Sequence, residues 1–188
     1  MEELLENKQK SFINFIKNNK KKLLTVLLIL VIFLSVWKII DEIERKDNIK
    51  ISEEFNHATA LIKEKKTNEA TLALKKIIRE KNKFYSPSSL NLIIDNDLEL
   101  KTDEMIDLFD HVLKIKGVDK ELKNLMIIKK SIFVSESSKE SDMLDLLNPI
   151  LQSDSVWKKN AAQVLELYFF SKNEKEKAKE YRKYFNDN

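Results

Sequence analysis

An uncharged apolar stretch near the N-terminus constrains the fold more than any other feature of this sequence. Leu23–Trp37 reads LLTVLLILVIFLSVW, fifteen residues without a charge, of which twelve are Leu, Ile, Val or Phe. With Ile39 and Ile40 the segment reaches eighteen residues, or roughly 27 Å of helix against a hydrocarbon core of about 30 Å. These side chains together favour insertion by on the order of 5 kcal/mol. The stretch therefore predicts one transmembrane helix at residues 23–40.

Two other interpretations of the stretch are a buried helix of a soluble core and a cleaved signal peptide. A core helix usually keeps a polar stripe, and Leu23–Trp37 has none. A cleaved signal needs small residues at its cleavage site, whereas the segment continues with the bulky residues Val36, Trp37 and Lys38. We therefore favour an uncleaved membrane anchor.

The charges of the chain are unevenly distributed. Residues 1–22 carry six lysines and three glutamates, a net charge of +3, and Lys38 adds one more. Because the whole chain has a net charge of +3, residues 41–188 have a net charge of −1. A nearly neutral domain lacks the basic surface that nucleic-acid binding requires. The absence of cysteine excludes disulfide bonds and thiolate metal sites.

The lysines also predict an orientation for the anchor. Lys20–Lys22 directly precede the apolar stretch, and the positive-inside rule keeps such an end in the cytoplasm. We therefore expect a cytoplasmic leader at 1–22, a stalk at 41–50 and a domain at 51–188 on the opposite side of the membrane. Asp47-Asn48 is the place where we expect any break in the helix, since both side chains compete for backbone hydrogen bonds.

From Ile51 onward, apolar residues recur at the three- and four-residue spacing of helices, and no segment alternates as a strand does. Eight helices are expected in this domain, the first from Ile51. The later ones begin near Thr67, Ser86-Pro87, Thr102, Asp119, Ser141, Trp157 and Asn173. The sequence therefore predicts an all-α fold after the transmembrane helix.

Four similar stretches predict helical repeats. They read KKTNEA at 65–70, LKTDEM at 100–105, KESDML at 139–144 and SKNEKEKA at 171–178. Their apolar residues Ala70, Met105, Met143 and Ala178 are separated by 35, 38 and 35 positions. A period of this length with two helices per repeat is typical of tetratricopeptide repeats (TPR). We therefore expect a TPR-like α-solenoid of about four helical hairpins, with an irregular helical bundle as the alternative.

Stacked hairpins of this kind leave a concave surface on which a partner can bind. Ala58 and Ala70 lie twelve residues apart, at the positions where the helices of one hairpin cross closely. This register gives seven candidates for a partner groove: Phe55, Ile62, Leu90, Ile94, Leu125, Ile128 and Ile132. The dense aromatic group between Trp157 and Phe185 is expected to form the core of the last hairpin, with a peptide-binding patch as the alternative.

The sequence shows no pattern that indicates catalysis. Its two histidines, His57 and His111, lie on different predicted helices, and Gly117 is its single glycine. A nucleophile elbow or a phosphate-binding loop needs several glycines. Acidic pairs such as Asp103-Glu104 stand at predicted helix starts, where they complement the helix dipole. We expect no catalytic residue, no cofactor, no metal and no small-molecule substrate.

Two stretches carry a resemblance to a known family. They are Phe55-x-x-Ala58-x-x-Leu61 followed by Asn68-Glu69-Ala70, and Val156-Trp157-x-x-x-Ala161-Ala162-x-x-Leu165-x-Leu167. Together with a lysine-containing leader and one N-terminal span, they resemble the ancillary SecYEG translocon subunit family (YfgM-like). The resemblance covers about residues 20–188.

The resemblance implies a single-pass protein of the bacterial inner membrane with its C-terminal domain in the periplasm. It implies a non-enzymatic scaffold whose partners are the SecYEG translocon, periplasmic chaperones and emerging polypeptides. The alternative function is a cell-envelope assembly or structural adaptor that uses the same TPR-like surface to bind other machinery. An anchored hydrolase would need a polar pocket with convergent acidic residues, which the sequence does not show.

Overall fold

The computed structural model describes residues 2–98 and 100–186, and the side chains of 19–22, 24–98 and 100–184. The chain divides into two compact units, Met1–Lys50 and Ile51–Asn188. The described residues form eight helices and no strand. The prediction of an all-α protein is therefore confirmed.

The first unit is formed by helix α1 (Glu2–Lys63) up to Lys50. The rest of this helix, from Ile51, belongs to the second unit. The described apolar side chains of its segment 24–40 are all exposed, from 49% at Val36 to 68% at Leu24. The hydroxyls of Thr25 and Ser35 donate hydrogen bonds to main-chain oxygens of the same helix, at 3.0 and 2.8 Å. No hydroxyl of this segment would therefore lose a partner in an apolar environment. Among the described residues, α1 is the one helix long and apolar enough to cross a membrane.

The break expected at Asp47-Asn48 is absent, because α1 is continuous from Glu2 to Lys63. The intrinsic cost of Asp or Asn within a helix is below about 1 kcal/mol per residue, which is too small to end a helix by itself. One turn earlier, the Arg45 guanidinium is 2.9 Å from the Glu42 carboxylate, a pair that supports helix formation.

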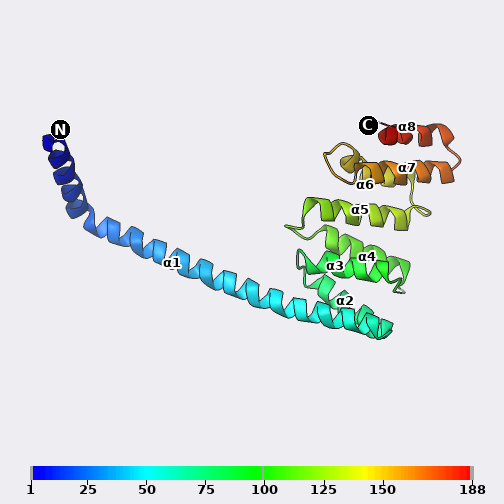
Figure 1. Ribbon diagram of the computed structural model, residues 1–188, viewed down its shortest axis with the longest axis horizontal. Coiled ribbons are helices and arrows are strands. Elements are labelled where there is room, and N and C mark those ends of the chain that lie inside the picture. The colour runs from blue at the N-terminus through cyan, green and yellow to red at the C-terminus, as the bar shows by residue number, and fades with distance from the viewer. Residues whose placement is uncertain (1, 99, 187–188) are drawn as a thin grey trace. The chain divides into compact units, whose positions relative to one another are not determined.

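The second unit contains the end of α1 and seven shorter helices. These are α2 (Thr67–Arg79), α3 (Tyr85–Asp95), α4 (Thr102–Leu113), α5 (Lys120–Val134), α6 (Glu140–Leu151), α7 (Lys158–Ser171) and α8 (Lys175–Asn186). From α2 to α8, each helix packs against the next one (Figure 1). Contacts also join α2 to α4 and α5 to α7. Two pairs of helices that are not consecutive along the chain, α2 with α4 and α5 with α7, are therefore neighbours in space.

The four similar sequence stretches occupy equivalent structural positions. Ala70, Met105, Met143 and Ala178 are each the fourth residue of an even-numbered helix. Each is at most 7% exposed. Each donates its main-chain N–H to the carbonyl of the residue just before its helix begins. The sequence repeat therefore marks the point where each even-numbered helix first enters the core.

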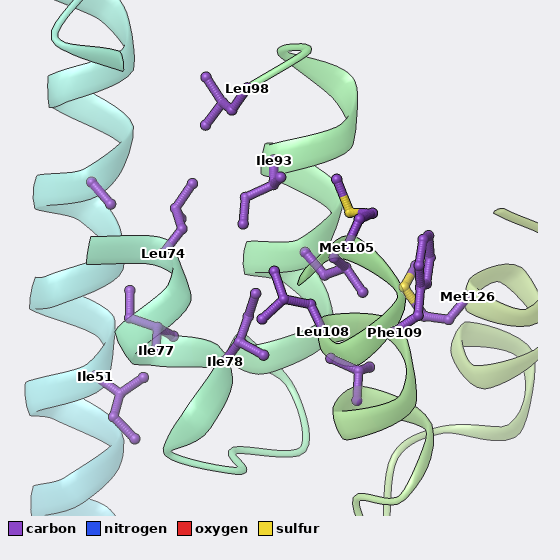
Figure 2. Packing of buried hydrophobic residues seen from close by; sticks show 13 residues of the cluster. Ile51, Leu74, Ile77, Ile78, Ile93, Leu98, Met105, Leu108, Phe109 and Met126 are labelled. Atoms are coloured by element: carbon purple, nitrogen blue, oxygen red, sulfur yellow. The ribbon is translucent and has the colours of Figure 1, made fainter. Parts of the chain in front are cut away.

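The core of the second unit consists of two clusters that meet at α5. The first includes Ile77, Ile78, Leu108 and Phe109, which lie between Ile51 and Met126 in Figure 2. The second comprises buried residues from Ile128 to Ala178. Because α5 supplies Met126 to one cluster and Ile128 to the other, it couples the two halves of the unit.

Three of the odd-numbered helices end in the same backbone motif. Lys65, Asp97 and Asn173 follow α1, α3 and α7 in the left-handed conformation, with φ of 59°, 48° and 67°. In each case the next N–H donates to a carbonyl five residues earlier, at 2.9–3.0 Å. This is the Schellman motif, which usually has glycine at the left-handed position.

Lys65→Gly is expected to stabilise the protein by up to about 1 kcal/mol. The left-handed conformation costs an L-residue about 1–2 kcal/mol, and glycine loses about 0.5–1 kcal/mol of this gain through its freedom in the unfolded chain. The measurement is thermal unfolding of the full chain in detergent, followed by circular dichroism. Lys179→Gly, within α8, is the matched control and should destabilise the protein. A similar loss for both variants would contradict the prediction.

Candidate partner groove

The seven residues predicted to line a groove lie in three different environments. Leu90 is fully buried in the first core cluster and offers no surface to a partner. Phe55, Ile62 and Leu125 are half-buried and pack against the same cluster. The remaining three, Ile94, Ile128 and Ile132, line hollows in the surface. Of the seven candidates, only Ile94, Ile128 and Ile132 therefore line a concave surface.

The larger hollow, of about 490 Å³, lies between α5 and α7. Its walls are formed by residues at three- and four-residue spacing, so that one face of each helix contributes. The lining residues are Ile128, Ile132, Ser135 and Glu136, followed by Asn160, Gln163, Val164, Leu167, Tyr168 and Ser171.

A smaller hollow of about 260 Å³ lies on the other side of α5, against α3 and α4. Its lining residues are Ile93, Ile94, Asp97, Leu98, Met105, Phe109, Lys129, Ile132 and Phe133. Ile132, which is 56% exposed, lines both hollows. The two hollows therefore adjoin across α5, and we call them together the partner groove.

Sequence reasoning missed the contribution of α7 to this groove. Leu167 is 61% exposed although it is a large apolar residue. It lies on the same helix face as Asn160 and Gln163, whereas Ala161 and Ala162 are buried on the opposite side. An apolar residue within an otherwise polar helix stripe is the signal that could have identified it.

The polar groups of the larger hollow are mostly uncharged. The side chains of Asn160 and Gln163 make no hydrogen bond within the part of the chain that the structure describes. Glu136 is the one carboxylate in the lining, and the Lys172 ammonium lies 3.1 Å from its main-chain oxygen. In the smaller hollow, Lys129 forms an ion pair of 2.7 Å with Asp95. The groove therefore offers amides and apolar surface, with charged side chains at Glu136 in the larger hollow and at Asp97 and Lys129 in the smaller one.

Tyr168 fixes one wall of the larger hollow. Its hydroxyl donates to the main-chain oxygen of Ser138, between α6 and α5, at 3.1 Å. Burial raises the pKa of Tyr168 above 10.0, and the charges of Glu140 and Glu174 raise it further. The hydroxyl therefore remains a hydrogen-bond donor at neutral pH.

Tyr168→Phe is expected to destabilise the protein by roughly 0.5–1.5 kcal/mol at neutral pH, because it removes this hydrogen bond. Since folding raises the pKa of Tyr168, its contribution is complete below the unfolded pKa of about 10 and is lost as the pH rises through the folded pKa. Chemical unfolding at a series of alkaline pH values should therefore show a steeper loss of stability for the wild type. Parallel curves for the two proteins would contradict this assignment.

The two histidines lie in different surroundings. His57 lies beside a shallow hollow where Glu54 forms an ion pair of 2.8 Å with Lys76. The Nε2 atom of His111 is buried and has no hydrogen-bond partner among the described residues. No group of three or more His, Cys, Asp or Glu side chains in the described part of the chain is placed to hold a metal ion.

Comparisons with known proteins find no matching family model, no matching curated protein and no matching solved structure. The apolar segment of α1 and the partner groove are therefore the features of the chain that bear on its function. The resemblance to the ancillary SecYEG translocon subunit family stays a hypothesis that experiments have to test.

Proposed function

We propose that the chain is a membrane-anchored, non-enzymatic scaffold that binds other proteins. The observation that carries this proposal is the combination of an apolar segment of α1, whose described side chains are all exposed, with a helical unit that has an open groove between α5 and α7. The apolar segment of α1 needs a hydrocarbon environment. The groove offers contact surface rather than reactive groups.

The proposed anchor spans the bacterial inner membrane once. Residues 1–22 are cytoplasmic, 23–40 cross the bilayer, 41–50 form a stalk and 51–188 lie in the periplasm. The support for this orientation is the position of Lys20–Lys22 before the apolar segment. Trp37 then stands at the outer interface, where indole rings are favoured.

We further propose that residues 51–188 form a TPR-like solenoid of about four helical hairpins. The support is a set of hydrogen bonds that join positions one repeat apart along the chain. The bonds Lys129–Asp95 and Ser155–Glu121 span 34 residues, Lys172–Glu136 spans 36 and Lys177–Glu140 spans 37. These separations match the period of the similar sequence stretches.

The proposed partners are the SecYEG translocon, periplasmic chaperones and emerging polypeptides, as the resemblance implies. The mechanism is an increase in effective concentration. A tether that confines the helical unit to the membrane raises the local concentration of its partners to about the millimolar range. Weak contacts with an emerging chain then become frequent without high intrinsic affinity.

The test is crosslinking in native membranes, followed by purification of the full chain in detergent. Recovery of translocon or chaperone components is the expected result. The matched control is a chain whose apolar segment carries two arginines, described in the Discussion, and it should lose these partners. Recovery dominated by cell-wall or division proteins would replace the proposal with the envelope adaptor, and recovery of no protein would overturn both functions.

A further inference from the structure

One end of the second unit is strongly basic, although residues 51–188 as a whole have no net charge. The connections from α2 to α3, from α4 to α5 and from α6 to α7 lie at this end of the unit (Figure 1). With their flanking residues they form three segments that we call the basic end: 79–84, 114–120 and 152–159. These segments contain eight lysines and arginines and three aspartates and glutamates, a net charge of +5. The rest of the unit therefore has a net charge of −5.

Contacts between side chains show that the three segments of the basic end are neighbours. A Cβ on Gly117 would lie 3.9 Å from the Cδ atom of Lys83, so the first two segments touch. Directly after the second segment, the Glu121 carboxylate accepts hydrogen bonds from the Ser155 hydroxyl at 2.6 Å and the Val156 N–H at 3.2 Å. Lysines that are distant along the chain thus form one surface.

Most cations of the basic end have no carboxylate partner. Arg79 forms an ion pair of 3.0 Å with Asp107, and the Lys158 ammonium lies 5.9 Å from the centre of the Tyr184 ring. The other six lysines are exposed and make no ion pair with any residue that the structure describes: Lys81, Lys83, Lys114, Lys116, Lys120 and Lys159. Because like charges so close together repel one another, an anionic surface placed against them is attracted.

Large apolar side chains are exposed among these lysines. Phe84 is 59% exposed and Val156 is 74% exposed, and Trp157 beside Val156 is half-buried. Lysines next to exposed aromatic and aliphatic side chains are typical of surfaces that lie on a membrane. An anionic lipid surface suits both kinds of residue, since its headgroups attract the lysines and its acyl chains accept the apolar side chains. An acidic protein surface would attract the lysines but leave Phe84 and Val156 beside charged groups.

The chain enters the second unit at the same end. The Phe55 ring centroid lies 5.5 Å from that of Tyr85, the first residue of α3, and Ile51 precedes Phe55 by one helical turn. Residues 41–50 are helical, a length of about 15 Å, of which lipid headgroups occupy about 5–8 Å. The basic end is therefore held within roughly the 8–10 Å over which charges act at ordinary ionic strength.

We propose that the basic end is a second membrane contact, which binds the anionic headgroups of the bilayer that α1 crosses. The lysines lie against the lipid phosphates, and Phe84 and Val156 enter the boundary of the acyl chains. The acidic remainder of the unit faces away from the lipid. This inference rests on the anchor that the proposed function assigns to residues 23–40.

The test measures how close each end of the unit lies to lipid, with the full chain in nanodiscs. Because the sequence has no cysteine, Val156→Cys provides one site for a fluorescent label at the basic end. Lys175→Cys provides a site at the start of α8, at the opposite end. The nanodiscs contain a lipid with a spin-labelled headgroup as quencher, in phosphatidylcholine alone or with about 30% phosphatidylglycerol. In the anionic nanodiscs the label at 156 should be quenched at least about twofold more than the label at 175, and phosphatidylcholine alone should remove most of this difference.

A matched pair of triple variants, each with the label at 156, tests the lysines. Lys81→Glu/Lys83→Glu/Lys116→Glu reverses three charges of the basic end and should remove the additional quenching in anionic nanodiscs. Lys101→Glu/Lys139→Glu/Lys175→Glu reverses three exposed lysines of the opposite end and should leave the quenching unchanged. Salt at about 0.5 M should weaken the quenching of the chain without these substitutions. Circular dichroism checks that both variants remain folded.

Equal quenching of the two labels in anionic nanodiscs, or equal losses for the two triple variants, would overturn the inference. Quenching of the same strength in both lipid mixtures would also overturn it. A chain that enters nanodiscs while its label at 156 stays unquenched would refute the second contact and leave the anchor in place. A chain that does not enter nanodiscs would overturn both the inference and the anchor.

Discussion

The double variant Leu30→Arg/Phe33→Arg is expected to leave the membrane fraction. Both side chains lie in the middle of the apolar segment of α1 and are 53% and 67% exposed. Each arginine costs about 2.5–3.5 kcal/mol at the centre of a bilayer and also removes about 0.5 kcal/mol of favourable transfer. The total of about 6–8 kcal/mol exceeds the roughly 5 kcal/mol that favours insertion.

Alkaline extraction of membranes followed by sedimentation checks this result. The control is Ile43→Arg/Ile49→Arg, which places two arginines on exposed positions of the same helix outside residues 23–40. The control should stay in the pellet with the wild type, and the first variant should move to the supernatant. A double variant that sedimented with the control would show that the segment is not held by hydrocarbon.

Phe169→Ala is expected to destabilise the second unit by about 3–5 kcal/mol, because it leaves a cavity in the core. Phe169 is 1% exposed. Its ring stacks on Tyr181 with centroids 5.5 Å apart and meets Tyr168 edge-on at 5.3 Å. A domain of ordinary stability has about 5–15 kcal/mol in total, so this single change removes a large part of it.

The next residue provides the matched control for this prediction. Phe170 is 59% exposed, and Phe170→Ala should change stability by no more than about 0.5 kcal/mol. Chemical denaturation of both variants in detergent gives the comparison. Similar losses of stability for the two substitutions would mean that the side chain of Phe169 does not lie in the core.

Helix positions in the second unit could be predicted because their signals are local. The sequence predicts a helix that begins at Asp119, and the Asp119 carboxylate accepts hydrogen bonds from the N–H groups of Glu121 and Leu122 at 2.9 and 3.0 Å. Gly117, just before it, has a φ of 76°, a conformation that glycine adopts without cost. Such caps and turns depend on a few neighbouring residues, so the sequence is sufficient to place them.

The candidate site was harder to predict because it depends on helices that are distant along the chain. Leu90 and Ile94 are both apolar and one turn apart on α3, yet Leu90 is buried and Ile94 lines a hollow. Since α3 packs against both α2 and α4, its apolar arc is wider than one face, and spacing alone does not show where the core ends. Ile132 and Leu167 line the same hollow only because α5 packs against α7, which the sequence does not show.

The most direct test of the account is the side of the membrane on which the C-terminus of the full chain lies. Two reporters serve, each fused in turn to the C-terminus: alkaline phosphatase, which is active outside the cytoplasm, and a fluorescent protein that matures only inside it. A membrane-bound fusion with active phosphatase and no fluorescence is the result that the account predicts. Fluorescence without phosphatase activity, or a fusion found in the supernatant, would contradict it.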